Sequence, residues 1–61
     1  MSYELDAAAR YRNHAEELRT IAEADRLVQT REMLLRVALD YDRMAHNMEE
    51  LEAMHSSFKH H

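Results

Sequence analysis

Residues 8–22 read AARYRNHAEELRTIA, and residues 38–51 read ALDYDRMAHNMEEL. Apolar side chains recur in both stretches at alternating intervals of three and four residues, which places them on one face of an α-helix. These stripe residues are Ala8, Tyr11, Ala15, Leu18 and Ala22 in the first stretch, and Leu34, Ala38, Tyr41, Ala45 and Met48 around the second. The spacing therefore predicts two amphipathic helices in an all-α chain.

The two stripes form an internal repeat with an offset of thirty residues, since Tyr11 recurs as Tyr41 and Ile21 as Leu51. Thirty residues of straight helix would rotate the second stripe by roughly 120° from the first. An unbroken rod could not hold both stripes against one partner, so we expect an antiparallel helical hairpin. One long continuous helix that pairs antiparallel with a second copy is the alternative, because neither Gly nor Pro interrupts the chain.

The expected hairpin is a single domain over residues 1–61. We expect helix one at about 3–24, a connection at 25–30, helix two at about 31–56 and a tail at 57–61, with Thr30 as the N-cap of the second helix. His60 and His61 end the chain and are either native residues or part of a purification tag.

The run from Tyr11 to Glu23, followed by Thr30-Arg31 and by Leu34 to Ala45, resembles a group of short, uncharacterised alphaproteobacterial proteins. Those proteins read YRxxAEELRxIAE, a short connection, and then TRxxLLxxAxDYxRMA. Members often carry Asp-Pro-like turn residues in the connection, where this chain has Leu27-Val28-Gln29. The resemblance implies a helical hairpin and no particular activity, substrate or cofactor.

A further column of residues runs beside each stripe and widens the apolar surface to three columns. The residues of this column are Ala7, His14 and Ile21 in the first stretch, and Val37, Met44, Leu51 and Phe58 in the second. A single hairpin of this size has too little core to cover so many large side chains. We therefore expect two copies to form a four-helix bundle with the stripes inside. The residues expected in this shared core are Tyr11, Ala15, Leu18, Ile21, Leu34, Val37, Tyr41, Met44, Met48 and Leu51.

Composition excludes several classes of function. The chain has 61 residues with 8 Lys+Arg, 12 Asp+Glu and no Cys or Gly, which argues against thiolate metal sites and glycine-rich phosphate loops. A net charge of −4 argues against nucleic-acid binding and against attraction to acidic membrane surfaces. We expect a cytoplasmic, non-enzymatic protein without a cofactor, which acts as an interaction or regulatory module.

Two charged clusters are candidate sites beyond the core. Arg26, Arg31 and Arg36 gather near the connection, where an acidic partner or the phosphates of a nucleic acid could dock; the alternative is ordinary placement of cations around a helix C-terminus. Glu52 and His55 form a Glu-x-x-His pair on helix two, the spacing with which ferritin-like bundles bind metal, and Glu4 would lie near them in a hairpin. A minimal ferritin-like metal-binding bundle is therefore the alternative function.

Overall fold

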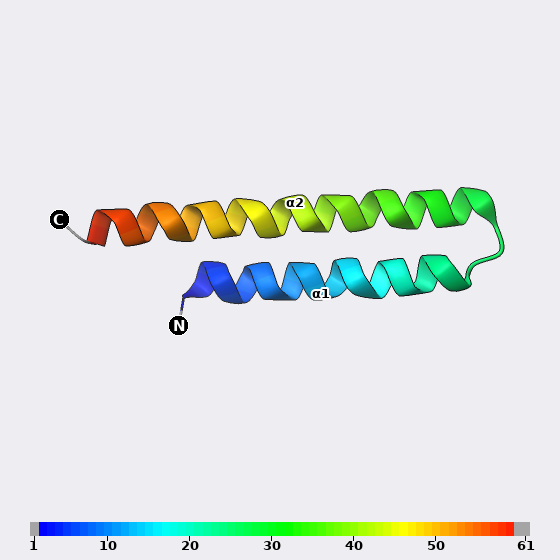
Figure 1. The fold of residues 1–61 in the computed structure, drawn as a ribbon, viewed down its shortest axis with the longest axis horizontal. Helices are drawn as coiled ribbons and strands as arrows, with labels where there is room; N and C mark the ends of the chain where they lie inside the picture. Colours follow the sequence, from blue (N-terminus) through cyan, green and yellow to red (C-terminus); the bar gives the residue numbers. More distant parts are fainter. Residues whose placement is uncertain (1, 60–61) are drawn as a thin grey trace.

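The computed structural model describes residues 2–59, which form two helices packed side by side as an antiparallel hairpin (Figure 1). Helix α1 comprises Tyr3–Ala24 and helix α2 comprises Val28–Lys59, and the described residues contain no β-strand. The hairpin measures 53 × 16 × 10 Å. The all-α hairpin prediction is confirmed, and the alternative of one continuous helix is wrong, because the chain reverses at residues 25–27.

Helix α1 begins and ends at the predicted residues. The hydroxyl of Ser2 caps it by accepting a hydrogen bond from the Leu5 N–H at 2.9 Å, and Glu4 and Asp6 in the first turn face the positive end of the helix dipole. The helix ends after Ala24, because the backbone of the next residue is extended.

Asp25 makes the turn that Gly or Pro would usually make. Its backbone N–H donates to the Ala22 carbonyl at 3.2 Å, and its side-chain Oδ1 accepts from the Leu27 N–H at 2.8 Å. The Arg31 guanidinium donates to the Asp25 carbonyl at 2.8 Å, and the Arg31 N–H donates to the Leu27 carbonyl at 2.9 Å. This Asx-type turn satisfies backbone groups at both helix ends within three residues.

The second helix extends three residues beyond its approximate predicted range at each end. The helix begins at Val28 rather than at residue 31, so Thr30 lies inside its first turn and is not the N-cap, because Asp25 completes the turn earlier than expected. The helix also continues to Lys59 rather than ending near residue 56, since no helix-breaking residue follows. Residues 57–59 are thus helical rather than a tail, and residues 60–61 lie outside the described range.

The two helices meet along a row of alanines. Their Cβ atoms allow the helix axes to come close together, and larger side chains alternate with them along the interface at intervals of three and four residues. Within the described residues the larger apolar side chains are only partly buried. The buried apolar residues are Ala7, Ala8, Ala15, Ala22, Ala38 and Ala45.

The two helices differ in length, 22 residues against 32. Figure 1 shows that α2 continues past the N-terminal end of α1, so the last turns of α2 have no α1 beside them. In residues 2–59, neither helix holds a stretch with the length and hydropathy needed to cross a lipid bilayer.

Candidate functional site

The alanine interface divides the hairpin into two faces of different chemistry. On each helix, the residues that follow the large interface residues point to one side of the interface, and a second heptad-spaced series, 7-14-21 on α1 and 37-44-51-58 on α2, points to the other side. We call these the polar face, with Arg12, Arg19, Asp42 and Glu49, and the apolar face, with Ala7, His14, Ile21, Val37, Met44, Leu51 and Phe58.

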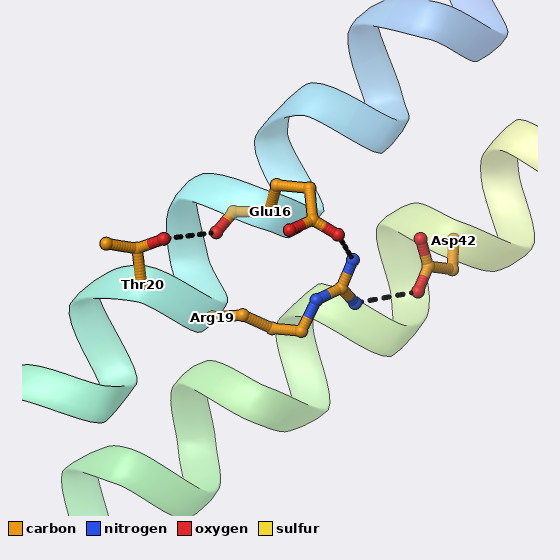
Figure 2. A network of polar contacts seen from close by, with 4 residues as sticks. All are labelled: Glu16, Arg19, Thr20 and Asp42. Atoms are coloured by element: carbon orange, nitrogen blue, oxygen red, sulfur yellow. Dashed lines mark hydrogen bonds and ion pairs between the residues drawn. The ribbon is translucent and has the colours of Figure 1, made fainter.

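Ion pairs cross between the helices on the polar face. The Arg12 guanidinium donates to both carboxylate oxygens of Glu49, at 2.6 and 3.3 Å, and Arg19 donates to Asp42 at 2.9 Å. Within α1, Arg19 also pairs with Glu16, whose carbonyl accepts from the Thr20 hydroxyl at 3.1 Å (Figure 2). The two cross-helix pairs are one heptad apart on each helix, so they match a single antiparallel register.

Hydrogen bonds to carboxylates stabilise the charged form of both arginines. The hydrogen bond to Glu49 raises the pKa of Arg12, and hydrogen bonds to Glu16 and then Asp42 raise the pKa of Arg19. The Arg12 and Glu49 side chains remain 46% and 40% exposed, so solvent screens their attraction. These pairs select the register more than they stabilise the hairpin.

The apolar face exposes large side chains along both helices. Val37 is 37% exposed, Met44 39% and Leu51 42%, and these three residues occupy successive heptads of α2. Ile21 of α1 is 54% exposed on the same side. This face is therefore a continuous apolar strip that the hairpin alone leaves in contact with water.

Aromatic rings connect the apolar face with the alanine interface. The centroid of the Tyr41 ring lies 6.0 Å from that of Tyr11 and 5.3 Å from that of His14. Tyr11 and Tyr41 are half-buried, whereas His14 is exposed. The Tyr41 ring of α2 therefore packs near two rings of α1, at the edge of the apolar face.

The structure divides the predicted shared core into two groups. Six of its residues lie in the interface between α1 and α2 and are buried or partly buried: Tyr11, Ala15, Leu18, Leu34, Tyr41 and Met48. The other four lie on the apolar face and are exposed: Ile21, Val37, Met44 and Leu51.

The predicted basic tip is only partly available for docking. Arg31 turns back onto the Asp25 carbonyl and stabilises the connection, while Arg26 and Arg36 are exposed. Leu27 and Val28, at 67% and 59% exposed, share this end with the arginines. The connection thus combines an apolar surface with positive charge.

The candidate metal ligands come together only in part. His55 Nδ1 lies 3.2 Å from Glu4 Oε2, as expected for a hairpin, and Glu52 Oε1 accepts a hydrogen bond from the Ser56 hydroxyl at 2.7 Å. Within residues 2–59, no three His, Asp or Glu side chains converge in an arrangement that could hold a metal ion.

Two shallow depressions on the surface of the hairpin are open to solvent. One is lined by residues of α2 around Leu39 and His46, and the other by the end of α1 and the connection around Ile21 and Asp25. Neither depression lies between the two helices, so neither brings groups from α1 and α2 together for chemistry.

Sequence reasoning missed the cross-helix pairs Arg12–Glu49 and Arg19–Asp42. Their signal was present, since each arginine and each acid directly follows an interface residue. Searches against models of protein families, curated proteins and solved structures found no match to this chain.

Proposed function

We propose that this chain is a non-enzymatic helical interaction module that assembles as a homodimeric four-helix bundle through its apolar face. The observation that carries the proposal is the exposed strip formed by Ile21, Val37, Met44 and Leu51, which flanks an interface whose fully buried residues, within 2–59, are alanines. A second copy supplies the same strip, so the face is complementary to itself in the way that a two-fold interface requires.

The surface area of the hairpin supports this assembly. A compact monomer of 7.3 kDa has an accessible surface of about 4,200 Å² by the scaling for folded proteins, whereas this chain exposes 4982 Å². The excess of about 800 Å² equals the area that each partner buries in a standard protein interface. Burying the apolar face therefore gives the protein the compactness that one hairpin lacks.

The polar face supports the same arrangement from the other side. Arg12, Arg19, Asp42 and Glu49 are already paired within the hairpin and keep their contact with solvent in the bundle. The outer surface of the dimer, including the exposed Arg26 and Arg36, is then available to an acidic protein partner. We also propose a cytoplasmic location, which the amino-acid composition favours.

Matched substitutions on α2 test the proposal. Met44→Lys places a charge on the apolar face, whereas Leu39→Lys places the same charge on an exposed apolar residue outside that face. Sedimentation equilibrium should give twice the 7.3 kDa chain mass for the parent and for Leu39→Lys, and a single chain mass for Met44→Lys. A parent protein with the mass of one chain at all concentrations, or an equal effect of both substitutions, would overturn the proposal.

A further inference from the structure

We propose that the second copy lies antiparallel to the first, with the two connections at opposite ends of the bundle. Helix α2 then packs on α2 of the second copy, and α1 packs on α1. This inference rests on the proposed dimer and adds its orientation, which follows from helix length, the order of side chains on the apolar face and the distribution of charge.

Helix length distinguishes the two orientations. A two-fold axis that lies between the apolar faces runs either across the helices or along them. Across the helices, the 32-residue α2 packs on another 32-residue helix; along them, it packs on the 22-residue α1 of the second copy. The second arrangement leaves ten residues of each α2, about 15 Å at 1.5 Å per residue, without a partner.

The unpartnered length of α2 is not polar. Phe58 and Met54, near its C-terminal end, are 71% and 55% exposed, and Figure 1 shows this end extending beyond α1. In the antiparallel dimer, the same segment lies beside the connection and the first turns of α2 of the second copy, where Leu27 and Met33 are 67% and 55% exposed. Two separate apolar surfaces of the hairpin thus cover each other.

The apolar face is also symmetric in sequence. On α2, Val37 and Leu51 each lie seven residues from Met44. On α1, Ala7 and Ile21 each lie seven residues from His14. An axis that passes beside Met44 therefore places Val37 of one copy against Leu51 of the other, so the large apolar side chains of this α2 series meet one another.

Charge favours the same orientation. Residues 26–36, at the connection, carry three basic residues and one acidic residue, whereas residues 2–12 and 46–59, at the open end, carry three basic and five acidic residues. The antiparallel dimer places the positive end of one hairpin beside the negative end of the other. The parallel arrangement brings like charges together at both ends.

Spin labelling tests this orientation on the full chain, which has no native cysteine. Gln29→Cys places a label on the exposed first turn of α2 beside the connection. With the axis beside Met44, the antiparallel dimer should give an inter-chain distance of about 45 Å, thirty helical residues at 1.5 Å each, and that distance signal should disappear on dilution with unlabelled chain. A short inter-chain distance at this position would overturn the orientation while leaving the dimer intact.

Arg43→Cys provides the matched control. This exposed residue lies midway along α2, so its label gives a short inter-chain distance in either orientation. A short distance at Arg43→Cys together with a long one at Gln29→Cys supports the proposal. Absence of inter-chain coupling at both positions would remove the proposed dimer, and its orientation with it.

Discussion

The polar and apolar faces of this hairpin flank the same row of alanines, but one exposes ion pairs to water and the other exposes apolar side chains. On the polar face, Arg12 and Arg19 reach across to acids of α2 and remain hydrated. On the apolar face, Ile21 and Met44 remain 54% and 39% exposed to solvent. We infer that the polar face selects the register of the two helices within one chain, whereas the apolar face is the surface that the proposed dimer would bury.

The largest effect should come from the ring cluster between the two faces. Tyr41→Ala removes a half-buried ring that lies against Tyr11 and His14, and should lower the free energy of unfolding by about 2–5 kcal/mol. Leu39→Ala, an exposed position on the same helix, should change it by less than about 0.5 kcal/mol. Urea denaturation measures both, and equal losses would show that Tyr41 is not part of a core.

The next effect concerns the apolar face itself. Leu51→Ala should destabilise the proposed dimer by about 1–2 kcal/mol per chain, because the part of this residue that the hairpin leaves exposed, 42%, would be covered on assembly. The melting temperature of the parent should rise with protein concentration, since mass action stabilises an associated folded state. Circular dichroism melts over a wide concentration range measure this, and a parent midpoint that does not move with concentration would contradict the role of the face.

The connection should show a smaller effect. Asp25→Ala removes the acceptor for the Leu27 N–H and should cost about 1 kcal/mol of stability. Asp25→Asn keeps a side-chain oxygen at the same place and should recover most of the loss. Chemical denaturation of the two variants tests whether this hydrogen bond makes the turn; identical losses would assign the effect to the charge.

The polar face should respond less still. Arg12→Gln and Arg19→Gln break pairs that solvent screens, so their effect on the urea midpoint should be smaller than that of Asp25→Ala. It should shrink further at high salt, where exposed charges interact weakly. A large loss that persists at high salt would mean that this face contributes to stability as much as the apolar one.

The smallest effect is expected at the open end of the hairpin. Glu52→Ala and His55→Ala should leave the amount of zinc or iron bound after loading and dialysis unchanged, because no three ligands converge there in residues 2–59. Elemental analysis of the parent and both variants makes the comparison. Stoichiometric metal in the parent that is lost in both variants would restore the ferritin-like alternative.

Local sequence was sufficient for most of the hairpin. The spacing of Tyr11, Ala15 and Leu18 predicted the helical face, and the bounds of α1 follow from a cap and a turn that involve near neighbours only. The prediction of Thr30 as the N-cap of α2 is wrong, because the turn is made by Asp25 and α2 already begins at Val28. Both residues favour turns, and propensity alone does not rank them.

Two amphipathic helices with a wide apolar stripe could be predicted from the spacing of residues alone, because helical periodicity acts over a few residues. Only the tertiary structure decided how that stripe divides, with Ala15 and Ala45 in the interface and Met44 left on the outer strip. It also decided that Arg19 reaches Asp42 as well as its neighbour Glu16. The physical reason is that a three-column stripe fits several helix crossings, and the register that brings small residues together is a property of the pair of helices.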